Sequence, residues 1–253
     1  MELHFKKIGN GPALVILHGL LGSGDNWQSL AKKWANKFTV YLVDQRNHGH
    51  SEHSSEFTFD LMVADLESLL EKENITECYL LGHSLGGKTA MRFAQLNDKI
   101  VTKLIVVDIG TKSYPPHHNE IFDALNSVDF NIHNTRNLVD QQLSLHITQA
   151  GVRMFLMKNL YWKEKGLLAW RFNLDALHAN YNEVVSNIPE FPCLVETLFI
   201  RGENSGYILD TDWDGIQDIF PNSELCSISN AGHWVHAEQP TQLSDCVIDF
   251  LQD

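Results

Sequence analysis

Short apolar runs alternate with longer amphipathic stretches along most of the chain. Six runs are apolar at successive positions, which is typical of strands that are covered on both faces, as in a parallel sheet. They span residues 13–19, 38–44, 78–84, 103–108, 196–202 and 224–229. Helical patterns lie at residues 26–35, 60–72, 85–96, 213–219 and 242–251, and "ELHFKKIG" near the start adds a possible outer strand. This alternation predicts an α/β fold with a mostly parallel, doubly wound sheet flanked by helices.

One long segment departs from this alternation. Residues 111–190 show no strand pattern, and they are bounded by the proline-bearing stretches "SYPPHH" and "IPEFPC". Inside the segment, Val152, Phe155, Leu156 and Leu160 recur at helical spacing. We therefore expect a core formed by residues 1–110 and 191–253, with residues 111–190 inserted as a helical lid.

Composition narrows the class of protein. The chain has 253 residues, 43% hydrophobic and 20% charged, as in an ordinary globular protein with a sizeable core. Its net charge of −13 makes nucleic acid an unexpected partner. No apolar run approaches the ~20 residues needed to span a bilayer, and the N-terminus lacks the pattern of a signal peptide. The scattered Cys78, Cys193, Cys226 and Cys246 predict reduced thiols and a cytoplasmic location.

The run "CYLLGHSLGGKTAM" carries the first chemical signal. Gly82-His83-Ser84-Leu85-Gly86 matches G-x-S-x-G, with a strand pattern before it and a helix pattern after it. In this setting the serine occupies a sharp strand-to-helix turn, where flanking glycines avoid clashes and the hydroxyl projects above the sheet. The alternative is a glycine-rich turn with a chance serine. The strand–turn–helix setting favours Ser84 as a nucleophile.

A serine nucleophile needs a base and donors for an oxyanion. His233 follows the last strand pattern in "SISNAGHWVHAEQP", whereas His236 is interpreted as structural. One oxyanion donor is expected from the backbone of Leu85, the residue after the nucleophile. The other is expected from Leu20, in the loop after an early strand, with Leu21 as the fallback.

The chain resembles the α/β-hydrolase superfamily, and within it the small YbfF-type bacterial esterases and their mitochondrial relatives. The segments that carry the resemblance are "HGLLGSGDNW", "DQRNHGHS", "GHSLGGKTAM", "RGENSGYI" and "NAGHWVHAEQP". The resemblance implies hydrolysis of carboxylic esters or thioesters, with acyl-CoA among the proposed substrates. It also implies that the loop from Asp44 to Ser51 is mainly scaffold, tied down by Asp44 and Arg46.

The acid of a Ser-His-Asp triad is where the chain departs from the common pattern of that superfamily. The usual aspartate position falls in "GENS" and reads as Ser205. Asp108 ends the strand directly after the nucleophile strand, which is an alternative acid site in the fold, and we expect it to be the acid with Ser205 in its hydrogen-bond network. Glu203, Asp210 and Asp175 are weaker candidates, and a strand-end cap is the alternative role for Asp108.

The lid segment supplies candidate substrate contacts. Phe155, Trp162 and Trp170 are expected to shape an acyl pocket, although packing within the lid is the plainer role for them. Residues 151–172 contain five basic residues and one acid, within a chain of net negative charge. Lys158 and Lys163 would therefore suit an anionic substrate such as an acyl-CoA, unless they belong to an ordinary solvated face.

The sequence thus predicts a serine esterase or thioesterase that needs no cofactor and no metal, since its histidines show no ligand spacing. The substrate is expected to be a small acyl ester or thioester. A C–C bond hydrolase or a cofactor-free haloperoxidase uses the same triad, and a non-catalytic receptor could retain it, so these remain alternatives.

Overall fold

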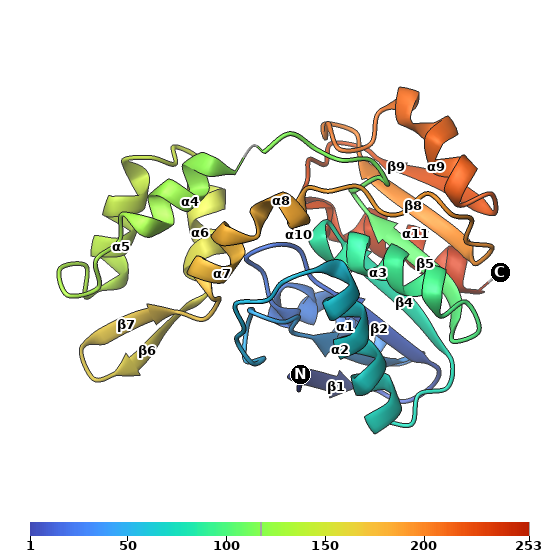
Figure 1. The fold of residues 1–253 in the computed structure, drawn as a ribbon, viewed down its shortest axis with the longest axis horizontal. Helices are drawn as coiled ribbons and strands as arrows, with labels where there is room; N and C mark the ends of the chain where they lie inside the picture. The colour runs from blue at the N-terminus through green and yellow to red at the C-terminus, as the bar shows by residue number, and fades with distance from the viewer. Residues whose placement is uncertain (117, 253) are drawn as a thin grey trace.

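The computed structural model describes residues 1–116 and 118–252, and its centre is a twisted sheet (Figure 1). Seven strands of the described chain pair in the order β1-β3-β2-β4-β5-β8-β9, and only β1 runs antiparallel to its neighbour. Their bounds are Phe5–Ile8 (β1), Ala13–Leu17 (β2), Thr39–Val43 (β3), Cys78–His83 (β4), Val101–Val107 (β5), Glu196–Gly202 (β8) and Ser223–Ile228 (β9). The expected α/β fold class is confirmed, including the outer strand near the N-terminus.

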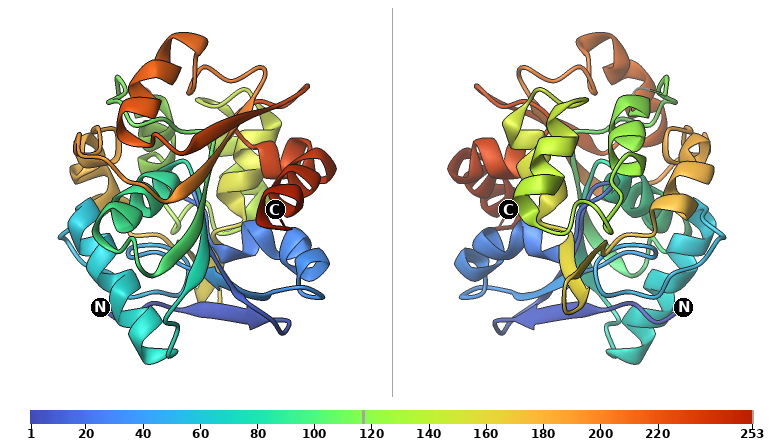
Figure 2. Two further views of the ribbon diagram at one scale, coloured as in Figure 1. Left: turned by 90° about the vertical axis from the view of Figure 1, so that its right-hand side faces the viewer. Right: turned by 90° about the vertical axis from the view of Figure 1, so that its left-hand side faces the viewer.

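Helices cover both faces of this sheet, as the end-on views show (Figure 2). In β2, Leu14 and Ile16 face one apolar cluster while Val15 and Leu17 face the other, because successive side chains of a strand point to opposite faces. The first cluster includes side chains of α1 (Gln28–Trp34) and α11 (Pro240–Gln252), and the second includes α2 (Phe59–Lys72), α3 (Leu85–Leu96) and α9 (Trp213–Ile219). Burial on both faces explains why these strands are continuously apolar.

Three short helices connect larger elements at the sheet's edge. They are the 3-10 helices η1 (Gly24–Trp27) and η2 (Asp210–Asp212), and the single turn α10 (Val235–Glu238). Both η1 and α10 lie near the carboxyl ends of the strands, where Ser84 and His233 are found. Trp27 of η1 is fully buried.

The segment between β5 and β8 extends to one side of the core (Figure 1). It contains α4 (Asn119–Asn126), α5 (Arg136–Ser144), α6 (Ala150–Met157), α7 (Leu174–Ala179) and α8 (Tyr181–Val184). It also contains a hairpin of β6 (Leu160–Glu164) and β7 (Leu167–Trp170), so the expectation of a purely helical insertion was wrong. The hairpin's pattern is weak because β6 buries only Leu160 and β7 only Leu168, which leaves no apolar alternation to recognise.

The cysteines also differ from expectation. Cys226 on β9 and Cys246 on α11 form a disulfide, whereas Cys78 and Cys193 are buried free thiols. The two bonded residues are 20 positions apart and meet only because α11 packs beside β9, which no local spacing reveals. Two of the four cysteines are therefore not reduced thiols, and a cytoplasmic location stays a prediction.

Within the described residues, no helix is long and apolar enough to cross a bilayer.

Candidate active site

Ser84 lies in the turn between β4 and α3, and its backbone is left-handed with φ 53° and ψ −117°. The turn requires small neighbours. A Cβ on Gly82 would lie 2.2 Å from the carbonyl oxygen of Gly86, and a Cβ on Gly86 would lie 2.4 Å from that of Leu17. The G-x-S-x-G spacing thus has a steric cause, and the turn places the Ser84 side chain at the carboxyl end of the sheet.

His233 lies in the loop between β9 and α10 and connects two other predicted residues. Its Nε2 is 3.1 Å from Ser84 Oγ, and its Nδ1 is 2.7 Å from Asp108 Oδ2. Asp108 follows β5 directly, is fully buried and has a left-handed φ of 51°. The structure therefore brings Ser84, His233 and Asp108 into one hydrogen-bonded row, contributed by the ends of three different strands.

Two further donors hold the Asp108 carboxylate. The backbone N–H of Gly202 donates to Oδ1 at 2.9 Å, and the Ser205 hydroxyl donates to Oδ2 at 2.5 Å. Ser205 thus lies in the network that the sequence suggested. The weaker acid candidates lie elsewhere: Glu203 accepts the Asn230 N–H, Asp210 pairs with Arg201, and Asp175 is in the first turn of α7.

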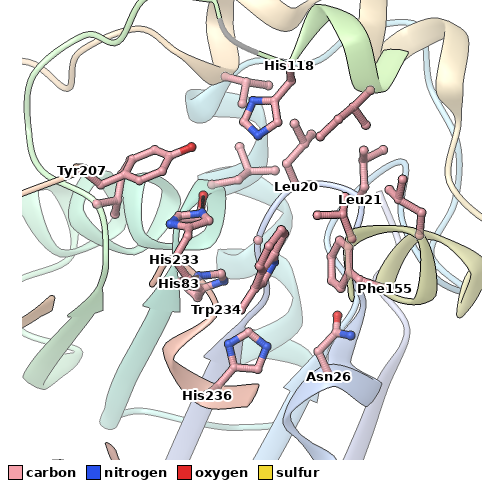
Figure 3. Close-up of a pocket in the computed structure, with 18 of the residues that line it drawn as sticks. Leu20, Leu21, Asn26, His83, His118, Phe155, Tyr207, His233, Trp234 and His236 are labelled. Atoms are coloured by element: carbon pink, nitrogen blue, oxygen red, sulfur yellow. Dashed lines mark hydrogen bonds between the residues drawn. The ribbon is translucent and has the colours of Figure 1, made fainter. Parts of the chain in front are cut away.

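Two aromatic rings fix the imidazole of His233 (Figure 3). Tyr207 stacks on it with ring centroids 4.0 Å apart and planes 19° apart, and the His83 ring lies 4.8 Å away. His83 Nε2 donates to the His233 carbonyl at 2.9 Å. Burial, with His233 and His236 nearby, holds the pKa of His83 well below its usual value, so this ring stays neutral. Sequence reasoning missed the role of Tyr207 although it stands in "RGENSGYI", because nothing in that segment shows that its ring meets His233, whereas His83 stands inside the serine motif.

The residues predicted to supply the oxyanion donors line the same cavity as Ser84. Leu85 is the first residue of α3, where an N–H has no partner within the helix. The Leu21 N–H instead donates to His48 Nε2 at 3.1 Å, so the fallback donor is already engaged. His48 donates through Nδ1 to the Arg46 carbonyl, and burial together with His18 lowers its pKa to about 3. Leu20 therefore remains the candidate for the second donor.

The loop from Asp44 to Ser51 supports this region as scaffold. Arg46 donates through Nε and Nη2 to both carboxylate oxygens of buried Asp65, at 2.6 and 2.9 Å. Asp44 accepts the backbone N–H groups of Gly24 and His50. Burial lowers the pKa of His18, and its Nε2 accepts the Gln45 N–H, which fixes the loop that carries Leu20.

A mostly apolar cavity with about 50 Å³ of open space has Ser84 in its lining. Figure 3 shows Tyr207, His233, Trp234 and Phe155 around it. The core side contributes Ser84, His233, Trp234 and Tyr207. The segment between β5 and β8 contributes the opposite wall, which includes Ile121, Val152, Phe155, Leu156, Val184 and Val185.

Only one of the five predicted substrate contacts lies in this cavity. Phe155 lines it, whereas Trp162 is 56% exposed to solvent and Trp170 packs on Phe172. Lys163 is exposed on β6. The helical spacing that suggested Phe155 was informative, but the hairpin turns Trp162 and Lys163 away from the cavity.

A second hollow adjoins the first and shares Asn26 with it. Three basic residues line it, Arg136, Lys158 and Arg171, together with Asp25 and Asp44. Asp25 pairs with Lys6, and the hydrogen bonds from Gly24 and His50 occupy Asp44. Lys158 is close enough to His236 to contribute, after burial and His233, to the lowering of its pKa to about 3.

Among residues 1–116 and 118–252, no cluster of three or more His, Cys, Asp or Glu side chains could hold a metal ion.

Comparison with known proteins agrees with this arrangement. A family model described as the alpha/beta hydrolase fold matches residues 12–144. The sn-1-specific diacylglycerol lipase ABHD11 of Mus musculus is 38% identical over 250 residues, covering 95% of this chain and 81% of that protein. Esterase YbfF of Escherichia coli is 34% identical, covering 96% of this chain and 94% of its own. A solved structure of a marine microorganism esterase is 41% identical, covers 98% and 99% of the two chains, and superimposes with a TM-score of 0.96.

The chain belongs to the α/β-hydrolase family. Its resemblance to the YbfF-type esterases is confirmed by the identity to esterase YbfF along nearly the whole of both chains. The expected enzyme class, a hydrolase of the carboxylic-ester group, is the class named for these relatives.

Proposed function

We propose that this protein hydrolyses carboxylic esters through an acyl-enzyme formed on Ser84, with His233 as the base and Asp108 as the acid. The observation that carries the proposal is the unbroken row of hydrogen bonds from Asp108 through His233 to Ser84, at the floor of an apolar cavity. A structural turn serine would need neither the buried carboxylate nor the imidazole beside it.

Each group has one role in the reaction. His233 Nε2 accepts the Ser84 proton as Oγ attacks the acyl carbonyl, and the N–H groups of Leu20 and Leu85 stabilise the oxyanion. His233 then donates that proton to the leaving oxygen or sulfur. Water attacks the acyl-enzyme with His233 as base, and the acid is released. Asp108 keeps the Nδ1 proton in place and stabilises the imidazolium.

The cavity favours a short acyl group. The open space over Ser84 is about 50 Å³ and its lining is mostly apolar, so it suits an acyl group of a few carbons better than a long chain. We propose that residues 111–190 act as a lid, which supplies the apolar wall and excludes water from the acyl-enzyme.

The test is hydrolysis of p-nitrophenyl esters from acetate to palmitate, with wild type beside Ser84→Ala. We expect the highest kcat/KM at acetate to butyrate, and loss of turnover in Ser84→Ala. Equal activity in both proteins would remove Ser84 from the mechanism. Absence of turnover by wild type, with no labelling by a fluorophosphonate, would favour the receptor, and labelling without turnover would favour a C–C bond hydrolase.

The basic hollow favours a second candidate substrate class, thioesters with an anionic leaving group such as coenzyme A. Arg136, Lys158 and Arg171 line this hollow, which shares Asn26 with the cavity, so the phosphates of a long leaving group that extends out of the cavity would meet positive charge there. A neutral ester would leave this hollow empty.

Charge reversal separates the two classes. We expect Lys158→Glu to raise KM for acetyl-CoA and to leave KM for p-nitrophenyl acetate unchanged. Lys163→Glu is the matched control, because Lys163 has the same charge but lies on the exposed hairpin away from the hollow. If both reversals raised KM for acetyl-CoA equally, the effect would come from the overall surface charge and not from binding in the hollow.

A further inference from the structure

The lid segment leaves and re-enters the core at a single place, which we call the neck: residues 109–114 and 184–188. Its two segments are joined by backbone hydrogen bonds, from the Tyr114 N–H to Val185 O at 2.8 Å and from the Ile188 N–H to Thr111 O at 3.0 Å. Four neck residues also line the cavity over Ser84, namely Ile109, Tyr114, Val184 and Val185. The position of the neck therefore sets part of the cavity wall.

A fully buried lysine, Lys88, binds both segments of the neck. Lys88 is on α3, one turn after the nucleophile, and its backbone N–H donates to Ser84 O at 3.1 Å. Its ammonium group donates to the carbonyls of Thr111 (3.3 Å) and Lys112 (2.5 Å) in the first segment of the neck. It also donates to the carbonyl of Ser186 (2.6 Å) in the second segment. Every one of these acceptors is a backbone carbonyl. A buried ammonium group balanced by carbonyl dipoles is an unusual arrangement, because burying a charge costs free energy.

The neck is also connected to His233. Lys88 Nζ lies 5.3 Å from the centre of the Tyr114 ring. The Tyr114 hydroxyl accepts the Gly110 N–H at 2.8 Å, two residues after Asp108, and donates to Tyr207 O at 2.7 Å. Since Tyr207 stacks on His233, Tyr114 connects the loop that carries Asp108 to the residue whose ring packs on His233.

We propose that Lys88 is a positioning residue whose ammonium group binds both segments of the neck, an arrangement that we call the clasp. The clasp holds the lid-side cavity wall, and Tyr114, against Ser84 and His233. This inference rests on the proposed ester hydrolysis for its kinetic readout. The geometry of the clasp does not depend on which ester is the substrate.

The clasp depends on the charge of Lys88. Burial, and the nearby Lys112, lower the pKa of Lys88 to about 7. A neutral amine has two hydrogens for three carbonyls and would turn its lone pair toward one of them. Around the neck, Lys112 pairs with Asp212, Arg92 pairs with Asp60, and Glu183 accepts the Phe59 N–H. The clasp is thus complete below pH 7 and weakens above it.

Lys88→Met is the decisive variant, assayed with p-nitrophenyl butyrate. In wild type we expect KM to rise as pH increases through about 7. In Lys88→Met we expect KM to be about tenfold higher at pH 6 and flat with pH, with kcat changed less than about threefold. Lys88→Arg keeps the charge, so it should retain a low KM that stays flat with pH.

Two lysines provide controls. Lys112→Met removes a neighbouring positive charge, so it should move the rise in KM to higher pH without abolishing it. Lys103→Met removes another largely buried lysine that donates to a backbone carbonyl, that of Phe250, and should leave KM unchanged.

Hydrogen exchange tests the clasp without any substrate. We expect faster exchange of the Tyr114 and Ile188 amides in Lys88→Met than in wild type, and no change in Lys103→Met. A folded Lys88→Met with wild-type KM, pH profile and neck exchange would overturn the proposal. If Lys88→Met does not fold, a pH profile of KM that does not move in Lys112→Met would overturn it instead. Wild type without esterase activity would refute the proposed function, and the exchange measurement would still decide about the clasp.

Discussion

The two walls of the cavity over Ser84 are built in different ways. On the core side, Ser84 and Asp108 each directly follow a parallel strand, and both are held in left-handed backbone conformations by the strands around them. On the lid side, Phe155 and Leu156 project from the two-turn helix α6, and their side chains pack in an apolar cluster of the lid. The reaction type is therefore fixed by the backbone of the sheet, whereas the substrate range depends on side chains that can be exchanged.

The largest effect is expected from the core side, at the acid. Asp108→Asn keeps an oxygen for the Gly202 N–H but cannot balance the imidazolium, so kcat should fall by about 10⁴-fold with little loss of stability. The measurement is kcat with p-nitrophenyl acetate beside the thermal midpoint of unfolding. Asp175→Asn, on the lid, is the matched control and should be close to wild type. A dead Asp175→Asn with an active Asp108→Asn would reverse the assignment of the acid.

A second prediction concerns the buried histidines on the core side. His236 stacks on Trp27 and has a pKa of about 3, largely because of burial, against an ordinary value of 6.5. The unfolded chain therefore binds more protons between these values, and stability falls as pH decreases below 6.5. Over the interval from pH 7 to pH 5 this loss is about 2 kcal/mol for one histidine.

His236→Phe should remove that share of the acid sensitivity. The difference in the free energy of unfolding between His236→Phe and wild type should shift in favour of the variant as pH falls from 7 to 5, in urea titrations at each pH. His146→Phe changes an exposed lid histidine and should leave the pH dependence as in wild type. Parallel curves for His236→Phe and wild type would mean that His236 is not buried in its neutral form.

The smallest effect is expected from the lid side. Phe155→Ala removes a ring from the cavity wall, so the preferred acyl chain should lengthen and kcat/KM for octanoate relative to butyrate should rise by about tenfold. The neighbouring Met154→Ala is a matched control because Met154 is 64% exposed. An unchanged chain-length profile in Phe155→Ala would mean that the acyl group binds elsewhere. It would contradict the inference that the lid-side wall determines the substrate range.

The same division explains how much could be predicted from the sequence. The core elements have local causes: continuous apolar runs define the strands, and the glycines beside Ser84 are required by contacts within a few residues or with the adjacent strand. The order of Ser84, Asp108 and His233 along the strands then places them together, because the carboxyl ends of parallel strands lie at one edge.

What the sequence could not provide depends on contacts between distant residues. Tyr207 stacks on His233 from a loop that follows a different strand, and Lys88 meets Ser186 across 98 positions. The hairpin of β6 and β7 has too few buried positions to be recognised, and Cys226 meets Cys246 only after α11 packs. Local patterns predict which elements form, and tertiary packing decides which side chains meet.

The paired ends of the insertion have an evolutionary consequence. Because Thr111 and Ile188 are hydrogen-bonded neighbours, the 76 intervening positions form an insertion whose ends meet, and the pairing of β5 with β8 does not depend on it. Natural selection, or an engineer, can lengthen, shorten or replace that insertion without disturbing the register of the sheet. New substrate preferences can therefore arise by recombination at the neck, while the inherited chemistry of the strand ends is preserved.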